Sequence, residues 1–124
     1  MKIKKIKVAF KDERGAIADI LSKQPIEYIT IISSKKGAVR GNHFHKRSVQ
    51  YNYVLKGKIK LLSRMPQGNI RNVILKPGDL ACNPPGEEHV LVALADSVFL
   101  VFTRGPRGGK NYEKDTYRLK NKLY

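Results

Sequence analysis

The three histidines of the chain lie in two short segments that could together form a chemical site. His43 and His45 are two residues apart in a stretch of extended character, so their side chains would point to one face of a strand. His89 follows a Pro-Gly turn at residues 84–86. Grouped imidazoles can bind a divalent transition metal, and with an ordinary pKa of about 6.5 they can also move protons near neutral pH. The sequence therefore predicts an active or binding site at these histidines.

Two amide residues are candidates for the same site. Gln50 and Asn52 are two residues apart, so they lie on the same face of the next expected strand. The inward positions of neighbouring barrel strands face one cavity. If a metal is bound, the expected ligands are His43, His45, Gln50 and His89. An amide carries no charge, however, and binds a cation more weakly than a carboxylate does. Proton transfer without a metal, and three structural histidines in a polar core, are the alternatives.

The rest of the sequence is β-rich. Short segments with β-branched and aromatic residues are separated by turn residues at intervals typical of a sandwich or barrel. We expect an all-β single domain over residues 1–124, in which a C-terminal extension at residues 104–124 covers the barrel mouth or a subunit interface. A turn is expected at residues 12–15. The expected strands are residues 3–10, 17–21, 26–33, 38–45, 50–56, 58–63, 72–75, 80–83, 89–93 and 97–103.

Composition limits the class of protein. The 124 residues suffice for one packed core, and no apolar run is long enough to span a membrane. The N-terminus alternates lysine with apolar residues instead of resembling a signal peptide, and the single cysteine excludes an internal disulfide, so a cytoplasmic protein is expected.

The net charge of +15 is concentrated at the two ends of the chain. We interpret it as a solvated basic surface, because no nucleic-acid motif accompanies it. Attraction of an anionic small substrate is a second interpretation, and nucleic-acid binding is the less favoured third.

Two spaced motifs resemble the signatures of the cupin superfamily. The first, residues 37–57, runs from Gly37 through the two histidines and Gln50 to Gly57. The second, residues 78–93, contains Gly78, a Pro-Gly turn and His89. The resemblance implies a cupin jelly-roll β-barrel. Gln50 stands where the superfamily usually has glutamate, and residue 93 is alanine where asparagine is common.

A narrower resemblance is carried by residues 40–47, Arg-Gly-Asn-His-Phe-His-Lys-Arg, together with Gln50 and His89. This pattern is similar to the dTDP-4-keto-6-deoxyglucose 3,4-ketoisomerases and, more widely, the deoxysugar epimerases. It implies a homodimeric isomerase or epimerase that needs no metal and acts on a nucleotide-linked 4-keto-6-deoxyhexose in polysaccharide biosynthesis.

The same resemblance implies roles for individual residues. His43 would carry the proton between carbons, His45 would relay a proton between oxygens, and Arg40 would stabilise the oxyanion or hold the diphosphate. The expected substrate-binding residues are Gln50, Asn52, His89 and Tyr28.

Two other classes of function are open. A metal-binding cupin of the dioxygenase or phosphosugar isomerase type would hold Zn, Ni, Mn or Fe on the histidines. A non-catalytic sugar-binding module would bind its ligand without proton exchange.

Residues outside the proposed site have simpler expected roles. Tyr51 and Tyr53 would face away from Gln50 and pack in the sheet or against a partner. Cys82 is expected to be a buried apolar thiol, with a metal ligand or nucleophile as the less favoured interpretation. The acidic pair at residues 87 and 88 is expected to be exposed in a turn; the alternative is that one of them hydrogen-bonds a histidine and sets its tautomer.

Overall fold

The computed structural model describes residues 1–107 and 113–124, and these residues form strands and turns with no helix. No helix in this part of the chain is therefore a candidate for crossing a membrane. The strands are β1 (Lys2–Lys5), β2 (Phe10–Asp12), β3 (Gly15–Ile17), β4 (Tyr28–Ser34), β5 (Val39–Phe44), β6 (Val49–Lys56), β7 (Ile59–Arg64), β8 (Arg71–Leu75), β9 (Asp79–Asn83), β10 (Glu88–Ala93), β11 (Ser97–Arg104) and β12 (Tyr117–Arg118).

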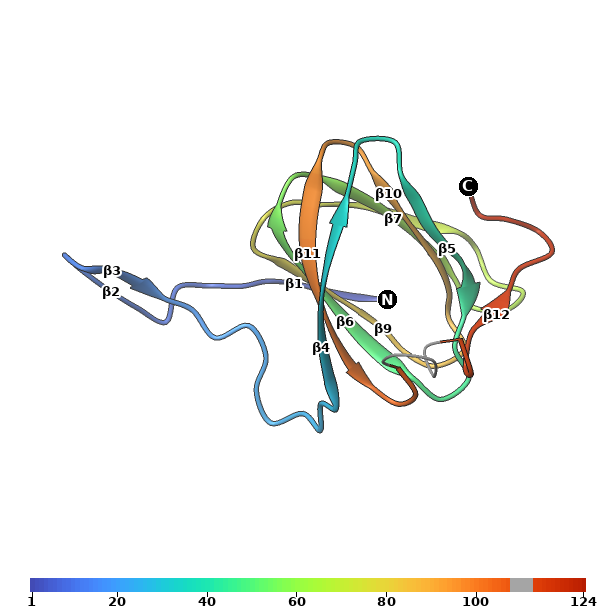
Figure 1. Ribbon diagram of the computed structural model, residues 1–124, viewed down its shortest axis with the longest axis horizontal. Coiled ribbons are helices and arrows are strands. Elements are labelled where there is room, and N and C mark those ends of the chain that lie inside the picture. Colours follow the sequence, from blue (N-terminus) through green and yellow to red (C-terminus); the bar gives the residue numbers. More distant parts are fainter. Residues whose placement is uncertain (108–112) are drawn as a thin grey trace.

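Two antiparallel five-stranded sheets pack face to face (Figure 1). The first has the order β1-β9-β6-β11-β4, and the second has the order β12-β5-β10-β7-β8. The inner faces enclose an apolar core of Val54, Ile59, Leu61, Leu75, Ala81, Ala93, Phe99 and Val101. This architecture confirms the all-β fold expected from the spacing of strands and turns and the jelly-roll barrel that the resemblance implied.

The C-terminal tail covers the outer face of the second sheet. Leu123 packs with Leu62, Val90 and Val92 in a second buried cluster, and Leu119 lies against it. β12 extends the same sheet by pairing with β5. A strand of two residues has no readable alternation, so the sequence did not predict it. The expected extension covers residues 104–124, and its residues 108–112 lie outside the described part.

The prediction of one strand over residues 3–10 is wrong, because this segment contributes to two separate strands, β1 and β2. β1 pairs with β9 only as far as Lys5 opposite Asp79, and the last bond runs from the Ile6 amide to the Gly78 carbonyl, 2.9 Å. Beyond that point the chain leaves the barrel and forms the hairpin β2–β3, which projects from the barrel (Figure 1). The expected turn at residues 12–15 is the tip of this hairpin. The expected strand at 17–21 ends at Ile17, since β2 begins at Phe10, the partner of Ile17, and offers no partner beyond it.

A β-bulge in β5 sets the geometry of the site. His43 is opposite His89 and Gly41 is opposite Val90, so Asn42 is an extra residue without a partner in β10. Asn42 has a φ of 57° and Gly41 a φ of +116°. Residues three apart normally face opposite sides of a strand. The extra residue brings Arg40 onto the same face as His43, because a bulge shifts the alternation by one position.

We expect Gly41→Ala to destabilise the protein strongly. A Cβ at this position would lie 2.7 Å from the His89 carbonyl oxygen and would have to adopt a φ of +116°. The combined strain and clash should cost about 2–4 kcal/mol in the free energy of unfolding, measured by urea titration. Gly15→Ala is the control, because Gly15 has a φ of +137° with no atom within 4 Å of the added Cβ. Equal losses for the two variants would show that the close backbone approach at Gly41 is unimportant.

Candidate active site

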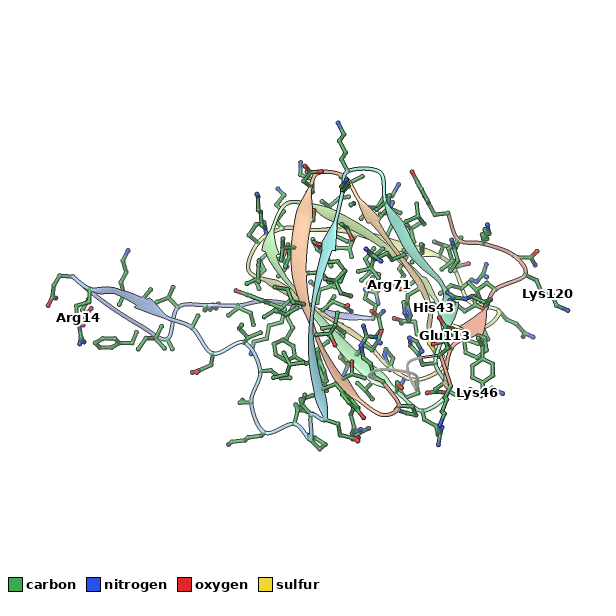
Figure 2. The ribbon with its side chains drawn as sticks, viewed as in Figure 1. Arg14, His43, Lys46, Arg71, Glu113 and Lys120 are labelled. Atoms are coloured by element: carbon green, nitrogen blue, oxygen red, sulfur yellow. The ribbon has the colours of Figure 1, made fainter. Side chains whose placement is uncertain are left out.

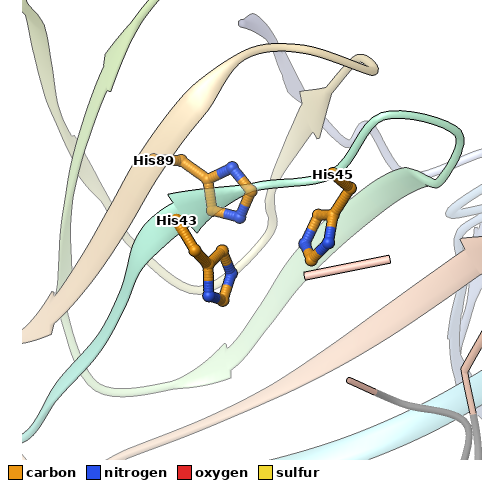
Figure 3. A group of neighbouring side chains, drawn as sticks. All are labelled: His43, His45 and His89. Atoms are coloured by element: carbon orange, nitrogen blue, oxygen red, sulfur yellow. The ribbon is translucent and has the colours of Figure 1, made fainter. Parts of the chain in front are cut away.

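The three histidines converge inside the barrel, with two of them on the paired strands β5 and β10 (Figure 3). Their ring centroids are 4.7 Å apart for His43–His45, 4.8 Å for His43–His89 and 5.2 Å for His45–His89. One ring nitrogen from each lies within 4.8 Å of those of the other two. The grouping predicted from spacing is therefore present in the structure.

The histidines line a cavity of about 310 Å³ between the two sheets. This volume is at the lower end of the range for small-molecule sites. Among the described lining residues none is acidic, whereas three are arginines, so the cavity favours an anionic ligand. The lining residues are Ile32, Val39, Arg40, Gly41, His43, His45, Gln50, Asn52, His89, Leu91, Phe99, Val101, Arg107, Thr116 and Arg118.

Hydrogen bonds to main-chain carbonyls fix the tautomers of two histidines. His45 Nδ1 lies 2.8 Å from the Asp115 carbonyl oxygen, and His89 Nδ1 lies 3.0 Å from that of Glu87. A carbonyl oxygen can only accept, so each Nδ1 carries the proton and donates it. Each neutral ring therefore has an unprotonated Nε2. His45 is 7% exposed, and its Nε2 has no hydrogen-bond partner in the described part of the chain.

His43 has the opposite tautomer. Its Nδ1 lies 3.2 Å from Nη1 of Arg118. A guanidinium group can only donate, so Nδ1 of His43 must accept, and the proton of the neutral ring is on Nε2. One imidazole of the site thus carries its proton on Nε2, and the other two carry theirs on Nδ1.

Burial keeps the histidines neutral at neutral pH. It is the main cause that lowers the pKa of His43 to about 3 and that of His89 to about 4, and the neighbouring imidazoles lower both further. Burial also lowers the pKa of His45, although the carbonyl of Asp115 opposes this change. Desolvation disfavours the charged imidazolium. At neutral pH each of the three rings therefore has one protonated and one unprotonated nitrogen.

The three histidines are close enough to share a metal ion, but His43 would first have to change its tautomer. A ligand to a metal must offer a lone pair, and the lone pair of His43 is directed at Arg118 while its other nitrogen is protonated. The three guanidinium groups that line the cavity add positive charge near the place that a cation would occupy. The histidines as held here are better arranged for proton transfer.

Three other residues expected at the site line the same cavity. The Arg40 guanidinium donates to Ser34 Oγ at 2.8 Å and to the Ser33 carbonyl at 3.0 Å, which fixes it on the cavity wall. Gln50 and Asn52 are buried on the inner face of β6. The placement of these residues follows from the alternation of β6 and from the bulge in β5.

Tyr28 has a different position from the one its expected role requires. It lies at the start of β4, opposite Thr103, and is 37% exposed. It is not among the residues that line the cavity. The sequence shows only the proximity of Tyr28 to the first motif along the chain, and β4 carries it past the cavity.

Two expectations for residues near the second motif are wrong. Glu87 is 3% exposed and not in an open turn: its carboxylate accepts from Asn83 Nδ2 at 2.7 Å and contacts the amino group of Met1. Glu88 is half-buried and pairs with Arg64. Cys82 is also only half-buried, because β9 turns its side chain to the outer face of the sheet while Ala81 faces the core.

The sequence interpretation missed Asp115, Arg107 and Arg118 as individual site residues. Arg107 and Arg118 line the cavity, and Asp115 is 2% exposed beside His45. No local pattern distinguishes these residues from others in the basic tail. The one available signal was an acidic residue inside a strongly basic segment, which suggests a specific partner.

Comparisons with known proteins agree with the fold. The family model described as Polysaccharide biosynthesis C-terminal domain matches residues 10–79. The sequence has no significant match among curated proteins. Among solved structures, the chain is similar to the sugar 3,4-ketoisomerase QdtA from Thermoanaerobacterium thermosaccharolyticum in complex with TDP. The two are 22% identical with a TM-score of 0.79, and the match covers 96% of this chain and 88% of the other.

Two further structures extend this similarity. A mutant of QdtA in complex with TDP-4-keto-6-deoxyglucose is 22% identical with a TM-score of 0.78, over 94% of this chain and 86% of that one. The dTDP-4-dehydrorhamnose 3,5-epimerase from Sulfolobus tokodaii is 22% identical with a TM-score of 0.72, and the match covers 86% of this chain and 70% of that one. At these identities the similarity shows a shared fold, which confirms the cupin barrel expected from the two motifs.

We expect the free energy of unfolding to fall as the pH drops from 7 to 5. An unfolded histidine has a pKa near 6.5, whereas the folded values are about 3 for His43 and about 4 for His89. When a histidine has a lower pKa in the folded than in the unfolded protein, its contribution to the free energy of unfolding is full above the unfolded-state pKa. This contribution is lost as the pH falls toward the folded-state pKa. The contribution of each of these two histidines to the free energy of unfolding should fall by on the order of 1 to 2 kcal/mol between pH 7 and pH 5.

Urea titrations at pH 7, 6 and 5 measure this loss. His89→Gln should flatten the pH dependence, and His43→Gln provides the same test should the first variant fold poorly. A free energy of unfolding that is constant between pH 7 and 5 would contradict the neutral, buried state of these rings.

Proposed function

The chain belongs to the polysaccharide biosynthesis C-terminal domain family, and from this premise we propose that it is an isomerase of a nucleotide-linked 4-keto-6-deoxyhexose, of the 3,4-ketoisomerase type. The observation that carries the proposal is that His43 holds its proton on Nε2 while the neighbouring His45 ring has an unprotonated Nε2. A proton donor and a proton acceptor at this separation suit an enolisation, which needs both.

The charge of the cavity supports a nucleotide diphosphate as the anionic part of the substrate. Arg40, Arg107 and Arg118 line the cavity, and guanidinium groups bind phosphate oxygens in bidentate fashion. In solved structures the similar ketoisomerase QdtA is bound to TDP and to TDP-4-keto-6-deoxyglucose. We assign Arg40 and Arg107 to the diphosphate and the histidines to the sugar ring.

The chemistry follows from the two tautomers. Nε2 of His45 takes the proton from C3 of the sugar, the C3–H electron pair forms a C3=C4 double bond, and the C4 oxygen takes the proton from Nε2 of His43. The resulting enediol returns the O3 proton to His43, and C4 takes the proton held by His45. The ketone has then moved from C4 to C3 and both histidines are regenerated. Delivery of the proton back to C3 from the opposite face would make the same site an epimerase.

The hydrogen bonds favour roles for His43 and His45 that are the reverse of those implied by the resemblance. His43 holds a proton on Nε2 and can give it directly to an oxygen, whereas His45 has no proton there to give. We therefore assign the carbon proton to His45 and the oxygen protons to His43. Gln50, Asn52 and His89 remain substrate-binding residues in this proposal, and no metal cofactor takes part.

Incubation with dTDP-4-keto-6-deoxyglucose in deuterated water tests the function. We expect deuterium in the sugar ring and a 3-keto product by NMR. His45→Asn should lower the exchange rate by about 10²- to 10⁴-fold, since it removes the base. Tyr51→Phe is the matched control, because Tyr51 is on the outer side of the same strand that carries Gln50.

Three results would contradict the proposal. One is an unchanged exchange rate in His45→Asn. Another is the absence of ring exchange together with stoichiometric Fe, Mn, Ni or Zn after dialysis, which would favour the metal-binding cupin. The third is ligand affinity without exchange or metal, which would favour a sugar-binding module.

We further propose that the protein is a homodimer built on the outer face of the first sheet. Ile29 and Ile31 of β4 are 69% and 67% exposed on this face. The projecting hairpin and the segment leading to it expose Val8, Phe10 and Ile17 at 56%, 53% and 60% (Figure 1; Arg14 marks the tip in Figure 2). A two-fold axis would let each hairpin cover the apolar face of the other copy, which makes the surface self-complementary.

The double variant Ile29→Asn/Ile31→Asn should be monomeric. Sedimentation equilibrium should give twice the chain mass of 14.1 kDa for the unmodified protein and a single chain mass for the variant. Ile74→Asn is the control, because Ile74 is an exposed isoleucine of β8 in the other sheet. A monomeric unmodified protein, or a variant that remains dimeric, would exclude this interface.

A further inference from the structure

One short C-terminal segment contacts two of the three histidines. Residues 113–118, which we call the strap, run past the open end of β5, and β12 lies within them (Figure 1). Figure 2 shows Glu113 and Lys46 at the same end of the barrel as His43. The strap supplies the carbonyl that accepts from His45 and the guanidinium that donates to His43.

The strap is anchored by a buried carboxylate. The side chain of Asp115 accepts hydrogen bonds from the amides of Lys46, Arg47 and Ser48 at 3.0, 2.9 and 2.8 Å, and from Ser48 Oγ at 3.1 Å. Burial opposes ionisation of this carboxyl, but the three amides outweigh it and lower its pKa. The carboxylate therefore locks the strap to the turn that immediately follows His45, while the carbonyl of the same residue faces the His45 ring.

Further contacts fix the strap beside His43. Tyr117 and Arg118 pair with Phe44 and His43 across β12 and β5, and the rings of Phe44 and Tyr117 stack at 5.3 Å. The Arg118 guanidinium is oriented from its other side, where Nη2 donates to Glu113 Oε1 at 2.8 Å. Arg118 is thus held by an ion pair within the strap while Nη1 donates to His43.

We propose that the strap positions the two histidines in complementary tautomers, with Arg118 as the positioning residue that makes His43 an N–H donor and the Asp115 carbonyl as the group that makes His45 a base. The tautomers are a property of the free protein, but their use in catalysis rests on the proposed isomerase function. An imidazole with a free choice of tautomer would present the required nitrogen only part of the time. The strap removes this choice at both rings.

Two-bond ¹H–¹⁵N correlation spectra of the uniformly ¹⁵N-labelled protein at pH 7 test the proposal directly. The chain has only three histidines, so single His→Gln variants assign the signals. We expect the Nε2–H pattern for His43 and the Nδ1–H pattern for His45 and His89. The Nδ1–H form of His43, or the Nε2–H form of His45, would overturn the proposal. The Asp115 contact is made by the main chain, so this spectrum is its test.

Arg118→Met isolates the role of the guanidinium. The Arg118 side chain is 59% exposed, so the variant should fold. We expect the His43 signals to shift toward a mixture of the two tautomers, with His45 and His89 unchanged. Arg118→Lys, which keeps a charged donor, should restore part of the Nε2–H form. Lys120→Met is the matched control: Lys120 is an exposed cation of the same tail and points away from the barrel (Figure 2).

Kinetics separate positioning from substrate binding. If Arg118 positions His43, Arg118→Met should lower kcat at least 10-fold, with partial recovery in Arg118→Lys. A change confined to KM, or an unchanged His43 tautomer in Arg118→Met, would overturn the proposal. The spectra need no substrate. If the tautomers are as expected and no sugar nucleotide reacts, the isomerase function fails while the structural role of the strap stands.

Discussion

The bulged pairing of β5 with β10 is the interaction on which the site depends. It sets His43 opposite His89 and, by inserting Asn42, brings Arg40 to the same face. The inserted residue also anchors the tail, because its carbonyl accepts from the Leu119 amide at 2.9 Å and its Oδ1 accepts from the Leu123 amide at 2.8 Å. The same irregularity that orients the cavity wall thus provides the docking point for the segment that carries the strap. Bulges commonly re-aim side chains next to functional sites.

The second constraint is that the buried polar side chains form a series of hydrogen bonds in which each donor has a defined acceptor. Asn52 Nδ2 donates to Asn83 Oδ1 at 3.1 Å, and Asn83 donates in turn to the Glu87 carboxylate. The Glu87 carbonyl then accepts from His89. Unpaired buried groups are costly, so a chain of this kind holds each member in one orientation. Among the described residues, His45 Nε2 and Thr103 Oγ1 are the buried side-chain atoms left outside this pairing.

The sequence was sufficient to predict the position of some site residues and strands but not of others. The alternation of Gln50 with Asn52 and the spacing of the three histidines were sufficient to place these residues in one cavity, because β6 is regular from Gln50 to Asn52 and the bulge in β5 comes before His43. Alternation alone would have put Arg40 on the wrong face; only the family resemblance pointed to it, since a bulge leaves no clear local pattern. The first strand stops at Lys5 because its antiparallel partner β9 begins at Asp79, and the sequence of β1 does not contain this information. Asp115 acts through contacts with residues almost 70 positions away, and no local periodicity reveals such contacts.

Neutral histidines in a cationic cavity have a consequence for the proposed reaction. A ring with a strongly depressed pKa accepts protons poorly, and nearby guanidinium groups contribute to that depression for His43 and His45. A bound diphosphate would bring negative charge against the same arginines and offset their effect on the imidazoles. The basicity of the histidines would then rise only when substrate is present. The anionic part of the substrate, distant from the reacting carbons, would in this way contribute to the proton transfer, and a sugar without its nucleotide diphosphate would meet a weaker base.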